Sequence, residues 1–404
     1  MKANKSIIDK LLIRSFLFTS IMGTIAPLQA STACQDARTL DEQRLFFLFE
    51  HWTSESAENI RKLIDAGTNI NARDDKGYTP LHWAVSCHCL RIVQLLLEKD
   101  ANIDAQDDEE CTPLHRAVSC CYLGIIQLLL KKNANINIKN NKGYTPLHLA
   151  VLYHRLKIVH LLLGQPKIDV NAKDHDGSVP LRSAILRKYQ EIAQSLIQYE
   201  ETDINVQDKY DQTPLHWAIL SNLLEIVRFL LERTEININV QDKYGQTPLH
   251  WAIRGNLSRI IQLVLQWPGI NIDVQVRDDD GNTLLHLAIH CWRNKITGYD
   301  FNIIEALVEV DQGAMLNEPN NVGDTPLDSV YQALNWNTVL NQEQLGEVYQ
   351  MIKYLIGKGA CAHKREQRSL YRTIKKAEET EEAIEKFWNL IVEHNAILDD
   401  GVGN

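Results

Sequence analysis

A four-residue motif, Thr-Pro-Leu-His, returns along this chain at a nearly constant interval, and this recurrence constrains the fold more than any other feature. The motif occurs intact or with one or two replacements at eight sites, which begin at Thr79, Thr112, Thr145, Val179, Thr213, Thr247, Thr283 and Thr325. Successive starts are 33, 33, 34, 34, 34, 36 and 42 residues apart. A period in this range indicates a repeat architecture, in which each unit buries its apolar face only against its neighbours.

The chemistry of one unit explains why the motif recurs. Thr79 can accept a hydrogen bond from an unpaired backbone N–H at a helix start, and Pro80 suits the first helical position. After a short turn, residues 90–97 carry apolar side chains at helical spacing. Residues 100–104 then lead into an extended loop. Each unit is therefore expected to be a helix, a turn, a second helix and a hairpin-like loop.

This unit resembles the ankyrin repeat, whose Thr-Pro-Leu-His start, leucine-rich second helix and Ala-Asn-Ile-Asn exit are matched almost residue by residue. The resemblance covers roughly residues 40–363. It implies an all-α fold, an ankyrin-repeat solenoid of stacked helix-turn-helix units with hairpin loops. The array is also similar to those of exported bacterial ankyrin repeat proteins.

The chain divides into four expected regions. Residues 1–30 form a signal peptide, and residues 31–74 form an N-terminal capping repeat that lacks the motif. Residues 75–363 hold about eight ankyrin repeats, the last two with insertions. Residues 364–404 form a C-terminal helical cap and tail.

The signal peptide is inferred from the order of residue types at the start of the chain. A basic leader precedes the apolar stretch 15–26, Pro27 follows, and the segment ends on the small residue Ala30. This order is typical of a secretory signal and predicts export to a periplasmic or extracellular location. An amphipathic helix on the repeat stack, with a cytoplasmic chain, is the alternative. A further alternative is lipidation at Cys34, although the leucine that begins a lipoprotein cleavage motif is missing.

Net charge and hydropathy restrict the class of partner. The chain has a formal net charge of -10, which disfavours nucleic acid because phosphate backbones attract basic surfaces. No apolar run after the signal is long enough to span a bilayer, which needs about 20 residues. The expected partner is therefore another protein.

Histidine and cysteine are the residues that most suggest chemistry. Six of the fourteen histidines belong to the repeat motif, and the resemblance implies that they hydrogen-bond within and between loops. Cys87, Cys89, Cys120 and Cys121 fall in two successive turns, where they could be free thiols, an off-register disulfide or a metal site. Their spacing does not match known zinc motifs. We expect no catalytic residue, no cofactor and no metal, because nucleotide-binding, zinc-protease and hydrolase motifs are also absent from the sequence.

Three departures from the repeat pattern carry structural expectations. Glu110 and Asp211 replace the hairpin glycine, which is expected to need a positive φ, so the hairpin at Glu110 should be strained or reshaped. Trp83, Trp217 and Trp251 share a core position and are expected to pack there, with a role in binding as the alternative. The insertions add Trp292, Tyr299 and Trp336, which are expected to form a second exposed aromatic cluster.

The resemblance also implies where a partner would bind. In ankyrin proteins the loop tips and the ends of the first helices line one binding face. The positions here that carry contact-type side chains are Tyr78, Tyr144, Tyr153, Arg187, Tyr210, Gln212, Tyr244, Gln246 and Arg254. Three functions stay open at this point: a protein-binding scaffold, an enzyme with a hidden site in residues 292–350 or 364–404, and a purely structural spacer.

Overall fold

A computed structural model describes residues 39–53, 55–267, 276–294, 300–310, 312–333, 342–361 and 389. Within these ranges the regular elements are helices, with no β-strand. They are α2 (Leu40–Glu50), α3 (Ser56–Asp65), α4 (Pro80–Ser86), α5 (Leu90–Glu98), α6 (Pro113–Cys120), α7 (Leu123–Lys131), α8 (Pro146–Leu152), α9 (Leu156–Leu163), α10 (Pro180–Leu186), α11 (Gln190–Gln198), α12 (Pro214–Leu220), α13 (Leu224–Leu231), α14 (Pro248–Arg254), α15 (Ser258–Leu265), α16 (Leu284–Asn294), α17 (Asn302–Val310), η2 (Ala314–Asn317), α18 (Pro326–Ala333) and α19 (Gln342–Gly357). The all-α solenoid expected from the repeat is confirmed.

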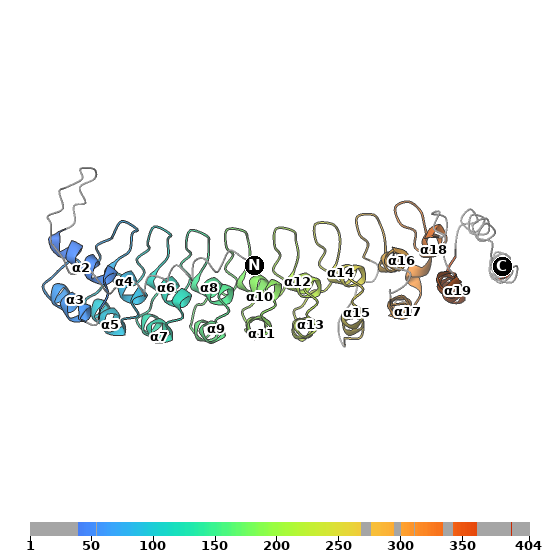
Figure 1. Ribbon diagram of the computed structural model, residues 1–404. Helices are drawn as coiled ribbons and strands as arrows, with labels where there is room; N and C mark the ends of the chain where they lie inside the picture. The colour runs from blue at the N-terminus through green and yellow to red at the C-terminus, as the bar shows by residue number, and fades with distance from the viewer. Residues whose placement is uncertain are drawn as a thin grey trace, which may run out of the picture.

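The helices form two parallel rows (Figure 1). The first helices of successive repeats contact one another from α2 through α18. The second helices contact one another from α3 to α7 and from α9 to α17. The hairpin loops project from the side of the first helices, away from the second helices. Because each unit touches only its neighbours, the apolar core is one continuous strip along the array.

The start and end of each first helix follow from local chemistry. Thr112 is the N-cap of α6, with an extended backbone, and Pro113 occupies the first turn, where its missing N–H is not needed. The turn to the second helix passes through a residue with positive φ, which breaks the helical path. Six repeats use a residue other than glycine there: His88, Cys121, His154, Lys188, Asn222 and Asn256.

The hairpins are also joined to one another. The backbone N–H of Asp108 donates to the carbonyl of Lys76 at 3.1 Å, and Asn141 repeats this bond to Glu109 at 3.0 Å. Such close approach explains why glycine is needed at Gly143, where an added Cβ would lie 2.5 Å from the backbone nitrogen of His175. Several neighbouring hairpins are therefore joined through their backbones rather than standing as separate loops.

A second line of hydrogen bonds joins the segments that leave the second helices. Oδ1 of Asn137 accepts the backbone N–H of Asp169 at 2.9 Å, and Oδ1 of Asn171 accepts that of Asp203 at the same distance. Asn205 continues the ladder to Asn237 at 2.8 Å. The asparagines of the exit motif thus fix the spacing between repeats.

One expectation is confirmed and another needs correction. Glu110 takes the expected positive φ, 58°, which is a strained conformation for a residue other than glycine. The hairpin is not reshaped, because the N–H of Glu110 bonds to the carbonyl of Asp107 as the glycine does elsewhere. Trp292 is not exposed, because only 2% of its surface is accessible and it packs in the core. Tyr299 and Trp336 lie outside the described residues, as do the expected signal peptide 1–30 and nearly all of the expected C-terminal cap 364–404.

The apolar helices of the stack are short. Across the described ranges, none has both the length and the apolar character that a membrane crossing requires.

Candidate functional site

The repeat histidines hold the first helix of one unit to the hairpin of the next. The backbone N–H of Thr112 donates to Nδ1 of His115 at 3.1 Å, so the ring proton resides on Nε2. That Nε2 donates to the carbonyl of Tyr144, 29 residues later, at 2.9 Å. Equivalent pairs occur at His82, His148, His216 and His286. The expected role of these histidines within and between loops is confirmed.

Burial keeps these imidazoles neutral. Loss of solvent is the largest effect on His115 and lowers its pKa to about 4, and the same cause lowers the pKa of His250 to about 4. A neutral ring that donates through Nε2 and accepts through Nδ1 serves as a structural link.

An Asp or Asn at the start of each hairpin organises the turn. Oδ1 of Asp242 accepts the backbone N–H groups of Tyr244 at 2.9 Å and Gln246 at 3.0 Å. Its Oδ2 accepts the indole N–H of Trp251 at 3.0 Å. These bonds direct the side chain of Tyr244 outward, because the carboxylate holds the backbone on both sides of the tip.

Four of the expected partner-binding residues lie near this hairpin and the first helices α12 and α14. They are Tyr210, Tyr244, Gln246 and Arg254. Tyr244 is 52% exposed and Tyr210 is 37% exposed. The ammonium of Lys243 lies 4.4 Å from the ring centre of Tyr210 and 4.8 Å from that of Tyr244, within the range of a cation–π contact. One lysine thus joins the tips of two neighbouring hairpins.

A pocket of about 670 Å3 opens beside these tips. Its lining residues come from two repeats: Ile219, Leu220, Asn222, Tyr244, Gln246, Trp251, Arg254, Gly255 and Leu257. It combines apolar walls with two amides and a guanidinium, which is the usual composition of a binding pocket. We call Tyr210, Leu220, Lys243, Tyr244, Gln246 and Arg254 the tyrosine–lysine surface.

The remaining expected residues lie elsewhere. Tyr78 is half-buried, and its hydroxyl accepts a 2.6 Å hydrogen bond from Arg116, whose guanidinium lies 4.4 Å from the ring centre. Tyr144 is half-buried beside His148, with ring centres 5.9 Å apart. Both tyrosines are therefore less exposed than Tyr153 and Tyr244.

Tyr153, Arg187 and Gln212 are dispersed along the same side. Tyr153 is 50% exposed just after α8, and Arg187 is exposed just after α10. Gln212 is half-buried and donates its backbone N–H to Asp208 at 3.1 Å. None of the three lines the pocket beside Tyr244.

Leu220, which is 55% exposed at the end of α12, is not among the contact residues expected from the sequence. Leu186, at the equivalent position of α10, is 38% exposed. An alignment of the repeats contains the signal, because this position is serine in the first two units (Ser86 and Ser119) and becomes leucine in the middle of the array. Leu220 lines the same pocket as Tyr244, so it adds apolar surface to that hollow.

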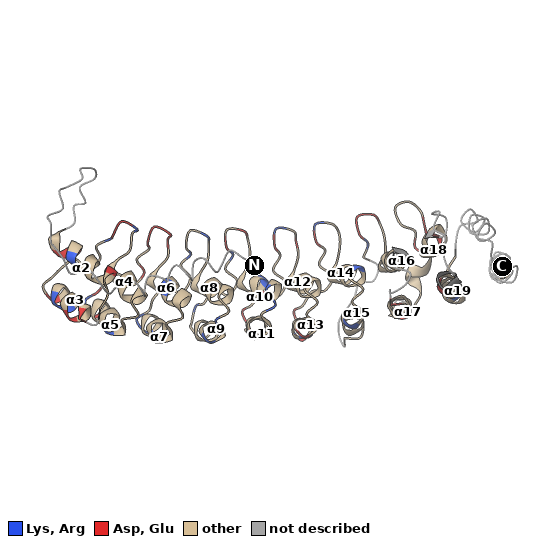
Figure 2. Ribbon diagram, viewed as in Figure 1, with Lys and Arg blue, Asp and Glu red and all other residues tan. Residues whose placement is uncertain are grey.

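Charge is unevenly distributed along the hairpins. The hairpin between α5 and α6 carries Asp107, Asp108, Glu109 and Glu110, whereas the tip between α13 and α14 carries Lys243 (Figure 2). Asp107 is buried and paired with Arg116 at 3.3 Å, so it is a structural residue. The tyrosine–lysine surface is therefore more basic than the N-terminal hairpins.

The cysteines and tryptophans are consistent with packing roles. No disulfide joins the cysteines of the described ranges, and burial raises the pKa of Cys87 to about 11. Where side chains are described, no group of three or more His, Cys, Asp or Glu residues is arranged to hold a metal ion. Trp217 is fully buried, as expected from its position, and Trp83 and Trp251 are half-buried.

Comparison with known proteins agrees with this architecture. The family model for ankyrin repeats (three copies) matches residues 34–107, 49–140, 104–174, 181–278 and 235–317. Acyl-CoA-binding domain-containing protein 2 of Arabidopsis thaliana is 38% identical over 75 residues. That match covers 19% of this chain and 21% of the relative, so the chain aligns with about a fifth of that protein's length. The family matches span most of the described array, and this chain belongs to the ankyrin-repeat family.

Proposed function

We propose that this protein is an exported, non-catalytic scaffold that binds a protein partner through the tyrosine–lysine surface. Ankyrin repeats serve protein–protein interaction, which supports the coarser part of the proposal. The export is inferred from the order of basic, apolar and small residues in the first 30 positions.

One observation carries the choice of surface. Tyr244 is 52% exposed and Leu220 is 55% exposed, and both border the same pocket between two first helices. Tyrosine offers large contact area for little loss of side-chain entropy, and arginine is enriched beside it in interfaces. A partner that inserts an apolar side chain here would also contact Arg254 and Gln246, which line the pocket.

The non-catalytic part of the proposal is supported by the roles of the titratable groups. The groups with the most strongly shifted pKa values are repeat histidines, a cysteine and tyrosines, and burial is the largest cause in each case. The histidines with a described bond between repeats are occupied in helix caps and hairpin links, so they are unsuited to act on a substrate.

The binding test has two stages. The chain beginning at Ser31 is used as bait for affinity capture, and the partner is identified by mass spectrometry. Binding of the purified partner to a Leu220→Ser, Tyr210→Ala, Tyr244→Ala triple variant is then measured by calorimetry. Interface tyrosines cost roughly 2 kcal/mol or more on truncation, so a loss of at least about thirtyfold in affinity is expected.

A Leu90→Ser variant is the matched control, because Leu90 is 46% exposed at the start of a second helix, away from the hairpins. It should bind as the unmodified chain does. Circular dichroism must be unchanged for both variants. Unaltered affinity of the triple variant would exclude this surface.

Export has its own test. Protein recovered from outside the cytoplasm should begin near Ser31 when its N-terminus is sequenced. An exported chain that still begins Met1-Lys2 would remove the cleaved signal from the proposal.

A further inference from the structure

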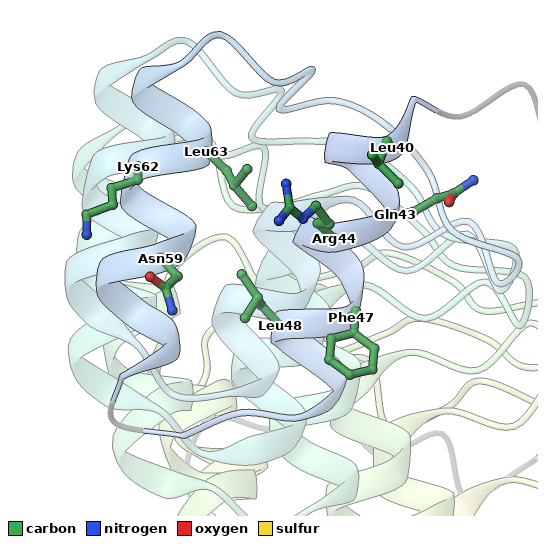
Figure 3. A pocket seen from close by; sticks show the side chains of 8 residues that line it. All are labelled: Leu40, Gln43, Arg44, Phe47, Leu48, Asn59, Lys62 and Leu63. Carbon is green, nitrogen blue, oxygen red and sulfur yellow. The ribbon is translucent and has the colours of Figure 1, made fainter. Parts of the chain in front are cut away.

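The outer face of the first helix pair is a second, separate hollow in the surface. A pocket of about 660 Å3 lies between α2 and α3, and its lining is shown in Figure 3. The lining residues are Leu40, Gln43, Arg44, Phe47, Leu48, Asn59, Lys62 and Leu63. Those from α2 are three or four residues apart, so they form one face of that helix.

This face exposes large apolar side chains. Leu40 is 70% exposed and Phe47 is 57% exposed, while Leu48 and Leu63 are half-buried beside them. The ring of Phe47 stacks on His51 with centres 4.2 Å apart. Terminal repeats usually present a polar outer face, so an apolar pocket at this end indicates a surface that is covered in use.

A further ankyrin repeat stacked on α2 and α3 cannot be what covers this pocket. Thr39 forms a capping box with Glu42, as Thr79 does with His82, so the two helix starts are equivalent. Arg44 therefore stands where Ala84 stands in the next unit. Ala84 is fully buried between neighbouring first helices. A long charged side chain at this position prevents the same close stacking.

The charge of the pocket restricts what can occupy it. Its eight lining residues include two cations, Arg44 and Lys62, and no acidic side chain. Arg44 approaches Asp41 only to 3.9 Å, with the side chains 67% and 54% exposed, and such a surface pair contributes little. Both cations can thus pair with negatively charged groups of a bound ligand.

We propose that this pocket binds an acidic amphipathic helix of a partner protein. Its apolar side chains would pack against Phe47 and Leu63, and its carboxylates would pair with Arg44 and Lys62. A helix laid in a groove between two helices is a common recognition mode. The pocket is several repeats away from the tyrosine–lysine surface, so the two proposals stand independently.

Charge argues against the other occupants. A second copy docked by the same face would bring Arg44 and Lys62 onto the same cations. Residues 31–38, which remain before α2 after the proposed cleavage, are also unsuitable, because they carry one acidic and one basic side chain and no large apolar one. A membrane surface would meet only two cations around a concavity that a flat bilayer cannot enter.

The test uses two fluorescent synthetic probes and the full chain. One probe is an 18-residue helix with leucine on one face and glutamate on the other, and the second carries lysine in place of every glutamate. Fluorescence anisotropy should show the glutamate probe binding at least about tenfold more tightly. An Arg44→Glu, Lys62→Glu variant should reverse this preference, because the lining then carries two negative charges.

Two further variants test the charge and the apolar surface of the pocket separately from the net charge of the protein. Lys131→Glu with Lys132→Glu, at the exposed end of α7, should leave the preference unchanged. Phe47→Ser should weaken binding of the glutamate probe without loss of circular dichroism, because Phe47 is exposed. Equal affinity for the two probes, or no reversal in the Arg44→Glu, Lys62→Glu variant, would overturn the proposal. Binding to phosphatidylserine vesicles without binding to the glutamate probe would overturn it in favour of a lipid surface.

Discussion

The indole N–H of Trp217 donates a 3.2 Å hydrogen bond to Oδ2 of Asp208, nine residues earlier in the chain. Oδ1 of the same carboxylate accepts the backbone N–H groups of Tyr210 at 2.8 Å and Gln212 at 3.1 Å. Arg182 of the preceding repeat adds a bond to Oδ2 at 3.1 Å. A single buried carboxylate thus joins a hairpin to its own first helix and to the neighbouring unit.

Replacement of this carboxylate should weaken the array at one place. Asp208→Asn keeps an oxygen for the turn but removes the charge that accepts from Trp217 and Arg182. Hydrogen bonds to charged groups contribute about 1.5–3 kcal/mol, so a loss of stability in this range is expected in urea unfolding followed by circular dichroism.

The double variant Asp208→Asn, Trp217→Phe isolates the pair. Residues in contact give non-additive losses, so the double variant should lose less stability than the two single losses combined. Strict additivity would show that the two side chains act independently.

A core truncation should act locally. Leu129 is fully buried in α7, and Leu129→Ala should cost about 2–5 kcal/mol because burial is lost and a cavity remains. Contacts in a solenoid run only between neighbours, so amide hydrogen exchange should accelerate most in the repeats that begin at Thr79, Thr112 and Thr145. Acceleration of equal size in every repeat would indicate that the array unfolds as one cooperative block.

The hairpin glycines provide a matched pair of substitutions. Gly143 and Gly177 have φ values of 76° and 75°, so alanine is strained at both. At Gly177 an added Cβ meets nothing within 4 Å, whereas at Gly143 it lies 2.5 Å from the backbone of His175. Gly177→Ala should therefore cost about 1 kcal/mol, and Gly143→Ala clearly more, since the neighbouring hairpin must move. Equal losses of thermal stability would show that contact between hairpins does not matter.

Acidification should destabilise the fold through the repeat histidines. Burial lowers the pKa of His115 to about 4 and also lowers the pKa of His82, His148 and His216 below the ordinary value of 6.5. Between these values the unfolded chain binds protons that the folded chain does not, so stability is present above pH 6.5 and is lost as the pH falls toward 4. Urea midpoints measured from pH 7 to pH 5 should decrease. The slope should be smaller in a His115→Asn variant, and an unchanged slope would exclude His115 as a source of the effect.

Much of this protein follows from local sequence. Thr112 and Pro113 start a helix wherever they occur, and His115 is placed three residues later to cap it, because these contacts lie within one helical turn. The period of the motif then implies the stack, since a pair of short apolar helices cannot bury itself alone. The helix pairs, the buried leucines and the structural histidines could all be predicted for this reason.

The exposure of individual side chains depended on the tertiary structure. Tyr78 and Tyr244 both belong to hairpins that precede a first helix, yet Arg116 of the next repeat covers Tyr78, while Tyr244 is 52% exposed. Trp292 is buried in the core that runs through the repeats, although its position in an insertion favoured the surface. These outcomes are decided by side chains about 30 or more residues away, and the pattern within one repeat does not contain them. The same reason applies to the pockets beside Tyr244 and Phe47, which exist only where two helices meet in space.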